Sequence, residues 1–514
     1  MTQQLITLTG INPSSPVPGK HREIRTNQGP SGGFVPGREA VIFCNKLASV
    51  GSGAIDGKGD ALNTPVMVSD EADVIARAGR KSEALLLWRT FRRANPATTV
   101  LYLLLVPPGT GTATCDFTFA TVPTGTGRIR IDSCGESEYV SFDSLDTVTT
   151  VAARVKDKIN EIAHWPIAAS NVNGVLTTAA SWAGSRGDHY INKLRITIVT
   201  SGIAMTVTKG SVTAGSADDD QTTAIASLET MPIFYQVNPK VVTSAVTSTD
   251  NGIGEHMAAV AQWVAPQGGK EQVVYTGQVG TPSQATTVAI SMNSEWAKHV
   301  HQEGSDWSCG MLASHHCGAV AYKEASHPGA RMTDYGINSS DLYFVPPPFA
   351  VADRVTEAEK ITLLNNGVSV IGFTSTGRGY IVRDVTTKSL HNGATDYRAR
   401  SGHIPSVCAD WVQLFQGEAN SVMQPFVADD WTEGQRPIPQ FSTPKDLKEV
   451  GRRCIGLRTG EGQFVTLDPS QVEAMVASLY AERQANGLSL SVGIAAVRHN
   501  DKRYLLVNET SPSI

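Results

Sequence analysis

The sequence predicts a mixed α/β fold of several domains. Residues 70–94 carry apolar side chains at helical spacing, and Asn95-Pro96 stops the helix. The run TTVLYLLLV that follows is continuously apolar, as in a parallel sheet covered on both faces. Residues 109–230 instead alternate apolar and polar positions between glycine turns, which favours hairpins. Together these patterns indicate an α/β body interrupted by a β-rich insertion.

The composition agrees with a chain that buries a large core. Of its 514 residues, 41% are hydrophobic and 18% are charged, which excludes a disordered class. At roughly 100–200 residues per domain, about three domains are expected. A net charge of -5 without any basic run gives no footprint for nucleic acid, so none is expected as a partner.

Targeting and redox signals are weak. The start MTQQLITLTG lacks a basic region before an apolar run, so we expect no signal peptide. No stretch approaches the roughly 20 apolar residues of a membrane span, so we expect no membrane insertion. The seven cysteines are scattered and lie mostly among apolar residues, which indicates reduced, buried thiols in a cytosolic setting.

The first half of the chain divides into three segments. Residues 1–38 are rich in Pro, Gly and Ser and are expected to form an extended arm. Residues 39–108 hold a strand in EAVIFCNKLA, a glycine-rich loop, one helix and one strand, as in a βαβ-like unit. Residues 109–230 form the insertion, with an amphipathic helix in TVTTVAARVKDKINEIAHWP between strands.

The second half returns to α/β patterns. Residues 231–350 show strands at MPIFYQVNP and EQVVYTGQV, and helices or helical turns at NSEWAKHVHQEG and SCGMLASHHCGAVAYKEA. Residues 351–514 show a helix at TEAEKITLLNNG, strands in VSVIGFTSTGRGYIVRDVTT and a helix at TPKDLKEVGRRC. A further helix begins at Asp468-Pro469 and runs to about Ala485. Two alternating strands close the chain.

Four possible sites have a simpler interpretation. GSGAIDGKGD (residues 51–60) lacks the glycine and the Ser or Thr of a phosphate loop, which favours a surface turn. GPSGG (29–33) has no strand–turn–helix context for a nucleophile, which favours a linker. Asp218–Asp220 lack the glycine and glutamate of a calcium loop, which favours a solvated charge run. Asp429 and Asp430 have no recognisable partner base.

One cluster carries potential metal ligands: His299, His301, Cys309, His315, His316 and Cys317. No C-x-x-C or H-x-x-x-H spacing occurs, and the adjacent His315 and His316 cannot point the same way. We therefore favour core cysteines and half-exposed histidines on a packed helix over a zinc site. No catalytic constellation emerges, and we expect no enzyme, no metal and no cofactor.

Three blocks of motifs resemble one family when they are taken in order. The first matches at Thr64, Pro65, Val66, Val68, Ser69, Ala72, Gly79, Ser82, Asn95 and Pro96. The second is WAGSRGDHYINKLRI, with Asp188 at or near a position usually held by Asn. The third matches at Asp353-Arg354, Thr356, Glu359, Leu363-Leu364, Asn366-Gly367, Val368-Ser369, Gly379 and Arg383–Thr387. In this order they resemble the tail sheath proteins of contractile-tailed phages, in particular the Mu-like type.

The resemblance implies a structural virion protein. Such sheaths have an inner α/β assembly domain built from both chain ends and an inserted β-rich outer domain. Hexameric rings stack helically around a tail tube, and contraction from a metastable extended state drives the tube through the host envelope for genome ejection. The implied partners are further copies of the chain, the tube protein, and the baseplate and tail terminator proteins. The implied location is the virion tail, after assembly in the host cytoplasm.

The resemblance also implies roles for two groups of residues. Strands exchanged between subunits are expected at Leu5, Ile6, Thr7, Leu8, Tyr504, Leu505, Leu506 and Val507. Basic residues on a predicted helix are candidates for facing the tube: Lys445, Lys448, Arg452, Arg453 and Arg458. An ordinary solvated helix face is an equal alternative for the second group.

Other functions stay open at this stage. The chain could be the sheath of a phage-derived bacteriocin or of a related contractile injection system. Less favoured are a metal-dependent hydrolase centred on residues 299–317 and an adhesin that uses the β-rich residues 109–230.

Overall fold

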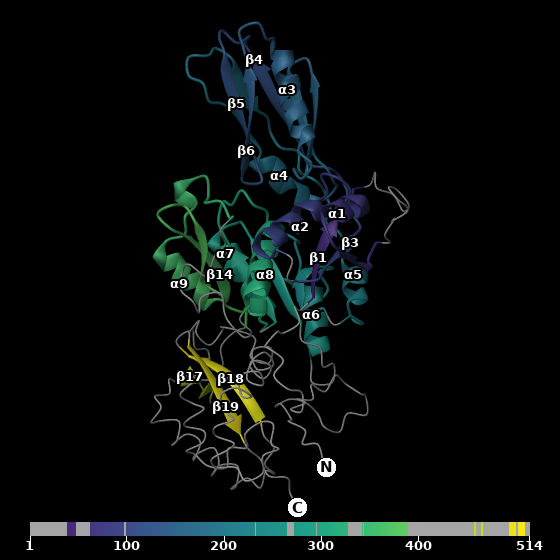
Figure 1. The fold of residues 1–514 in the computed structure, drawn as a ribbon, viewed down its shortest axis with the longest axis vertical. Coiled ribbons are helices and arrows are strands. Elements are labelled where there is room, and N and C mark those ends of the chain that lie inside the picture. The colour runs from purple at the N-terminus through teal and green to yellow at the C-terminus, as the bar shows by residue number, and fades with distance from the viewer. Residues whose placement is uncertain are drawn as a thin grey trace, which may run out of the picture.

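The computed structural model confirms a mixed α/β fold. It describes residues 39–47, 62–96, 99–231, 233–264, 272–294, 296–326, 342 and 344–388, and the backbone of four short strands farther on. Figure 1 shows a β-rich module at the top, above a body in which helices surround a sheet. No helix in the described ranges has both the length and the apolar character needed to cross a bilayer.

An eight-stranded sheet forms the centre of the body. Its strands run in the order β15-β14-β13-β12-β11-β1-β3-β2. Their bounds are β1 (Ala40–Asn45), β2 (Pro65–Val68), β3 (Leu101–Val106), β11 (Tyr235–Val237), β12 (Val273–Gln278), β13 (Ala297–His301), β14 (Val368–Phe373) and β15 (Gly379–Arg383). The six inner strands pair in parallel, whereas the edge strands β2 and β15 pair antiparallel.

Helices cover both faces of this sheet. The helices of the body are α1 (Glu71–Ala78), α2 (Glu83–Ala94), α5 (Thr222–Ser227), α6 (Ile253–Val264), α7 (Pro282–Met292), α8 (Cys309–Ser326), η3 (Val351–Asp353) and α9 (Glu357–Asn365). Val368 and Val370 of β14 pack with Leu363 and Leu364 of α9 in one core. His299 of β13 pairs in register with Val368 and therefore lies on the same face of the sheet. Lys298, the residue before it, points to the opposite face, toward α8.

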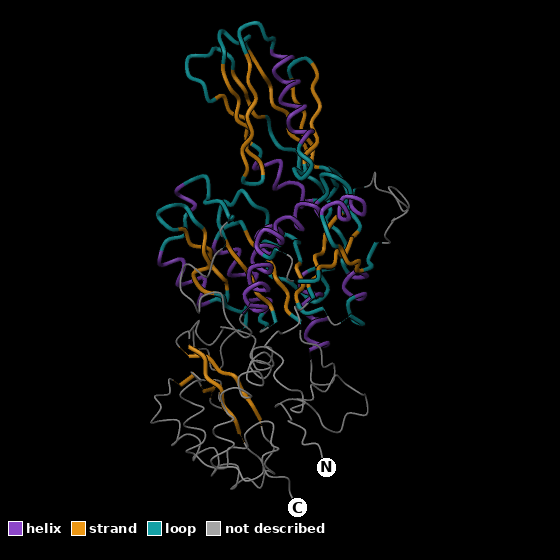
Figure 2. Tube along the Cα trace, viewed as in Figure 1, coloured by secondary structure: helices purple, strands orange, loops and turns teal. Residues whose placement is uncertain are grey.

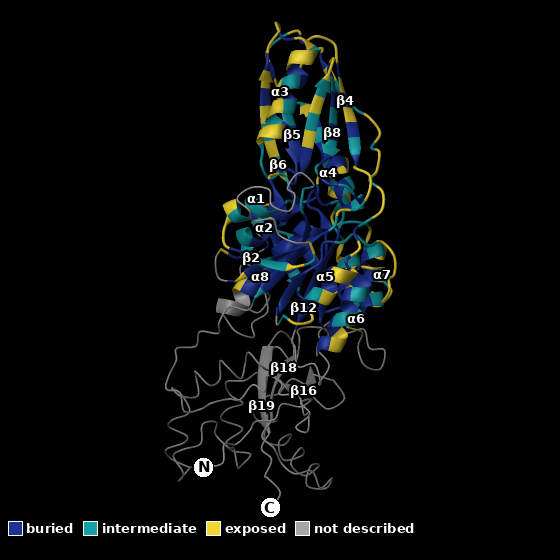
Figure 3. Cartoon of the chain, turned by 90° about the vertical axis from the view of Figure 1, so that its right-hand side faces the viewer, coloured by how far each residue is buried: buried dark blue, intermediate teal, exposed yellow. Residues whose placement is uncertain are grey.

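Burial on both faces of the sheet explains why the sequences of the inner strands are continuous apolar runs. Every residue of β1, β11, β12 and β13 is buried. Figure 3 shows the buried residues concentrated in the body beneath the module. The prediction of a parallel sheet covered on both faces is therefore confirmed.

Two predicted helices were wrong in detail. The single helix over residues 70–94 is two helices, because Gly79 has φ of 95° and Lys81 has φ of 66°. Ser82 then starts α2, with its hydroxyl accepting the Leu85 N–H. NSEWAKHVHQEG contains the strand β13 rather than a helix, because residues 297–301 pair with β12 and residues 299–301 also pair with β14.

The chain between β3 and β11 builds two further sheets, in the orders β10-β4-β8-β7 and β6-β5-β9. We call residues 113–210 the inserted module. Its elements are β4 (Thr114–Ala120), β5 (Gly127–Ser133), β6 (Glu136–Phe142), α3 (Val148–Glu161), β7 (Ile167–Val172), β8 (Val175–Ala180), η1 (Ser185–Gly187), α4 (Asp188–Lys193), β9 (Arg195–Ile198) and β10 (Thr206–Lys209). Figure 2 shows α3 lying along these strands.

Hairpins in the inserted module form where the sequence predicts them. Buried residues alternate with exposed or half-buried ones along β4, along β8 and in the first half of β5. Asn173 and Gly174 join β7 to β8 with φ of 51° and 82°. Two positive φ angles match the mirror-image turn that Asn-Gly favours between antiparallel strands.

The described part of residues 351–514 is divided between sheets. β14 and β15 belong to the eight-stranded sheet, which also holds strands from residues 39–108 and 231–350. Farther on, β16 (Leu457–Arg458) pairs with β17 (Phe464–Val465), and β18 (Gly493–His499) forms an antiparallel hairpin with β19 (Lys502–Asn508). The two closing strands are thus confirmed. The domain boundaries stay predictions, and the helices predicted at 443–454 and 468–485 lie outside the described residues.

The start of α9 offers a test of its predicted boundary. The Thr356 hydroxyl accepts the Glu359 N–H at 3.3 Å, and the Glu359 carboxylate accepts the Thr356 N–H at 2.8 Å. We expect Thr356→Ala to lower the free energy of unfolding by about 1 kcal/mol, as removal of an N-cap does. Thr362→Ala, on an exposed turn of the same helix, should change it by less than about 0.5 kcal/mol. Equal effects of both substitutions in urea unfolding would contradict this role.

Candidate functional site

The predicted contact residues are only partly described. Leu5–Leu8 and the basic residues from Lys445 to Arg453 lie outside the described residues, as do residues 29–33, 51–60, 429 and 430. Arg458 lies in β16 rather than in a helix. Tyr504–Val507 lie in β19, where they pair with Val497–Ile494 of β18. Their roles between subunits stay predictions.

The histidine and cysteine cluster belongs to the core. The prediction of half-exposed histidines was wrong, because His299, His301, His315 and His316 are all buried. The His315 Nδ1–H donates to the Thr90 carbonyl at 3.1 Å. His316 instead approaches Asp384 at 3.2 Å, so the two adjacent rings have different partners. Within the described ranges, no three His, Cys, Asp or Glu side chains form a group that could hold a metal.

A buried ion pair lies beside this cluster. Lys298 Nζ donates to the Asp384 carboxylate at 2.5 Å, and both side chains are almost fully buried. Burial acts to raise the pKa of Asp384, but Lys298 and then His316 hold it well below its usual range. The pair joins β13 to the chain just after β15. Sequence reasoning had included Asp384 only within the Arg383–Thr387 motif.

We call the junction between the inserted module and the body, where residues 109–111, 184–187 and 215–217 meet, the neck. It contains a second buried charge cluster. Arg186 of η1 lies 3.1 Å from the Glu83 carboxylate of α2 and 3.2 Å from that of Asp219. The Arg186 and Glu83 side chains are 2% exposed and that of Asp219 is 0% exposed. The prediction of a solvated run at Asp218–Asp220 was therefore wrong for Asp219.

Surrounding groups complete this cluster. The Asn45 N–H at the end of β1 donates to Glu83 at 2.9 Å, and the Gln221 amide donates to Asp219 at 2.9 Å. Burial raises the pKa of Glu83 to about 7, although Arg186 acts to lower it. Burial acts to lower the pKa of Arg186, but Asp219 and Glu83 hold it above its ordinary value. The guanidinium therefore stays charged while it joins the module to α2 and β1.

The loop that joins β13 to α8 holds one side of the module. Arg195 makes two hydrogen bonds to the Asp306 carboxylate, at 2.8 and 2.7 Å, and stacks 4.2 Å from the Phe349 ring centroid. Lys193 Nζ donates to the Gly304 carbonyl at 2.8 Å. The Tyr190 and Ser308 hydroxyls lie 2.8 Å apart. These contacts combine charge with fixed geometry.

The helix α2 and its preceding loop hold another side. The Arg89 guanidinium donates to His164 Nδ1 at 3.0 Å, and the opposite ring nitrogen lies 2.6 Å from the Glu136 carboxylate. Arg93 also pairs with Glu136. Burial acts to raise the pKa of Glu136, but hydrogen bonds from His164 and Arg93 lower it to about 2. Lys81 Nζ donates to backbone carbonyls at the end of α3 and in β7.

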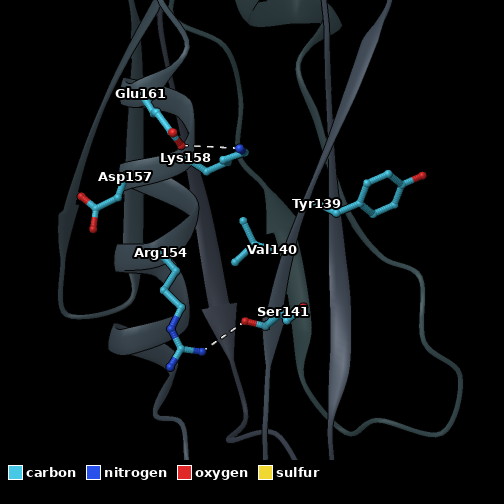
Figure 4. A pocket seen from close by; sticks show the side chains of 7 residues that line it. All are labelled: Tyr139, Val140, Ser141, Arg154, Asp157, Lys158 and Glu161. Carbon is cyan, nitrogen blue, oxygen red and sulfur yellow. Dashed lines mark hydrogen bonds and ion pairs between the residues drawn. The ribbon is translucent and has the colours of Figure 1, made fainter.

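A hollow on the module is a weaker candidate. It has a volume of about 500 Å³ and lies between β6 and α3. Figure 4 shows Arg154 directed toward Ser141, Lys158 directed toward Glu161, and Tyr139 directed away from the helix. Arg154 also pairs with Asp146, and Lys158 with Glu138. Both basic side chains in the hollow are therefore already paired within the protein.

The neck is thus the strongest candidate site, because its charged side chains join the inserted module to the body at several points. It contains guanidinium–carboxylate pairs and lysine–carbonyl contacts. Sequence reasoning missed Glu83, Arg186 and Asp306. The one available signal was the WAGSRGDHYINKLRI motif, which contains Arg186, Lys193 and Arg195.

Comparisons with known proteins find a likeness among solved structures. No protein-family model matches the chain, and no curated protein matches it. A chain in the cryo-EM structure of the anti-feeding prophage (AFP) baseplate, 6-fold symmetrised, is 10% identical. The match covers 97% of this chain and 96% of that chain, with a TM-score of 0.28. A TM-score this low carries no argument, so the function proposed below rests on the residues of this chain.

Buried histidines make the fold sensitive to acid. Burial lowers the pKa of His189, His301 and His315 to about 4 and that of His256 and His299 to about 3. Between about pH 4 and 6.5 the unfolded chain therefore binds more protons than the folded chain does, and stability falls as the pH falls. Each histidine contributes about 1.4 kcal/mol per pH unit within this window.

Glu83 acts in the opposite direction. Its raised pKa means that the folded state holds a proton between about pH 4.5 and 7, which favours folding at the lower pH. Five histidines outweigh this one carboxyl. A domain is stable by only about 5–15 kcal/mol, so we expect unfolding before pH 4. Urea titrations at pH 7.5, 6.5 and 5.5 would measure the trend, and an unchanged free energy of unfolding would refute it.

The Arg195–Asp306 pair should contribute more than an exposed pair. Its side chains are only 24% and 10% exposed and make two hydrogen bonds. A double-mutant cycle with Arg195→Ala and Asp306→Ala should give a coupling energy of about 1.5–3 kcal/mol. The pair Lys158–Glu161, with Glu161 70% exposed, serves as the control and should give less than about 1 kcal/mol. Similar couplings for both pairs would contradict the role of Arg195 at the neck.

Proposed function

We propose that this chain is the sheath subunit of a contractile tail, with a structural role and no enzymatic one. The observation that carries the proposal is where the sheath-like motifs lie in the fold. Positions that match the family coincide with residues that determine the backbone of one sheet and its helices. Such positions are the ones that a shared fold would preserve.

The first block of motifs contains the residues that delimit helices. Gly79 adopts φ of 95° where α1 ends, and the Ser82 side chain starts α2. Asn95 ends α2, and its amide donates to the Thr99 hydroxyl at 2.7 Å. Pro65, Val66 and Val68 lie in β2. The matched residues therefore define the turns and caps of the first part of the body.

The third block of motifs also contains residues that form turns and helix caps. Thr356 and Glu359 form the capping box of α9, and Gly367 has φ of 81° at the turn into β14. The Thr387 hydroxyl bonds both backbone groups of Ser294, at 3.0 and 3.1 Å. The first and third blocks lie far apart in the sequence, yet both supply strands to the eight-stranded sheet. This convergence supports a single assembly body made from distant parts of the chain.

In this proposal the subunits are linked through their termini. Among the described strands, β19 pairs with β18 alone. We propose that Tyr504–Val507 accept the strand Leu5–Leu8 of a neighbouring copy along the second edge, since backbone groups at a strand edge recruit a further strand. Lys445, Lys448, Arg452, Arg453 and Arg458 remain candidates for contacts with the tube.

Function then follows from two packings of the same subunits. Hexameric rings assemble around the tube in an extended, metastable state and reach a shorter, wider state when triggered. The free energy stored in subunit packing drives the tube through the envelope without nucleotide hydrolysis. A phage tail, a bacteriocin and another contractile injection system share this mechanism, and the proposal applies to each.

Electron microscopy tests the proposal directly. We expect the full-length protein to form hollow tubes, alone or with its tube protein as a template. Deletion of residues 1–12 and 500–514 should abolish them. Leu506→Pro should also abolish them because proline removes a backbone donor from the strand, whereas Leu506→Ile serves as the matched control and should assemble normally. Only monodisperse particles in every condition, including with the tube protein, would overturn the proposal.

A further inference from the structure

Three chain segments cross at the neck, and glycines lie where a Cβ would collide with a neighbouring backbone. The segments are residues 109–111 on the way into the inserted module, residues 184–187 within it, and residues 215–217 on the way out. A Cβ on Gly109 would lie 2.0 Å from the Ala217 carbonyl oxygen. A Cβ on Gly215 would lie 2.4 Å from the Gly184 carbonyl oxygen. Glycine at these positions lets the three backbones touch.

Hydrogen bonds tie the same three segments together. The Gly184 N–H donates to the Gly111 carbonyl at 2.8 Å, and the Ser216 N–H donates to the Thr110 carbonyl at 2.9 Å. The Asp188 carboxylate accepts the Gly215 N–H at 2.7 Å. A hinge is a segment whose backbone angles can change freely. Here the entering and leaving segments are instead bonded to each other and to a turn inside the module.

The crossing also determines where the buried charge lies. Arg186 stands between Gly184 and Gly187, and Asp219 follows Ala217 by two residues. From this position Arg186 reaches Glu83 of α2, which accepts the Asn45 N–H at the end of β1. Rotation of the module about the neck would separate a buried guanidinium from its carboxylates. Separating such a pair in a site closed to water is strongly unfavourable.

We propose that the neck is a rigid coupling: the glycine crossing fixes the path of the chain and Arg186 fixes the orientation of the inserted module. The module and the sheet then move as one body. A force on the module reaches α2 and β1 through Arg186 and Glu83. This inference does not depend on the sheath role; in a sheath it means that movement of the module turns the whole subunit.

Distance measurements between two spin labels test the coupling. Labels are placed by keto-amino-acid incorporation at Leu145 in the module and Met67 in the body, which are 92% and 56% exposed. The labelled full-length chain is diluted with unlabelled chain, so that assembly does not add distances between copies. Pulsed electron paramagnetic resonance of the native sequence should give a single narrow distance distribution. A broad native distribution would overturn the proposal by itself.

Substitutions separate the crossing from general destabilisation. We expect Gly215→Ala and Arg186→Met each to shift or broaden the distribution. Gly125→Ala is the matched control, because a Cβ there meets only the Ile203 side chain, at 3.3 Å. Asp188→Asn keeps an oxygen acceptor for the Gly215 N–H and should keep the narrow peak, whereas Asp188→Ala should lose it. Circular dichroism of each variant shows whether the sheets remain folded.

The outcomes are distinct. A narrow peak in the native chain that is lost in folded Gly215→Ala or Arg186→Met supports the rigid coupling. If both of these variants stay folded and keep the native peak, the proposal is wrong. If they unfold, Asp188→Ala beside Asp188→Asn decides the question, since retention of the native peak in Asp188→Ala would overturn it. None of these results depends on whether tubes form.

Discussion

A sheet of parallel strands must be covered on both faces, and the body of this protein is organised by that constraint. Strands β1, β11, β12 and β13 are buried at every position, so water reaches neither face of the central sheet. Helices must therefore lie on both sides, and they are supplied by the long crossover connections that parallel strands require. The strands that complete the sheet come from segments far apart in the sequence.

Burial on both faces brings polar groups into the core, where each needs a partner. His299 bonds to Thr276, His315 to a backbone carbonyl of α2, and Lys298 to Asp384. A pattern of histidines and cysteines that resembles a metal site in sequence is thus divided among different structural partners. The same burial keeps the histidines neutral and makes the core sensitive to acid.

The inserted module attaches to this core through buried and half-buried charge pairs as well as through apolar side chains, since both parts share one hydrophobic core. Arg186 and Arg195 each connect a different part of the module to the body, and Arg89 and Arg93 of α2 bind the Glu136–His164 pair of the module. Several separated contacts restrict rotation more effectively than one contact of equal strength. In the proposed sheath, such a junction lets the module and the assembly body act as one subunit.

The sequence by itself determined the α/β class, the burial of the central strands, the alternating strands of residues 109–230, and local features such as the helix that follows Thr356. These follow from interactions between near neighbours and from hydrophobic periodicity. Only the tertiary structure decided that residues 297–301 form a strand, that α1 and α2 are separate, and that Glu83, Arg186 and Asp219 meet. Those outcomes depend on partners distant in sequence, and neither periodicity nor spacing records which distant groups will be buried together.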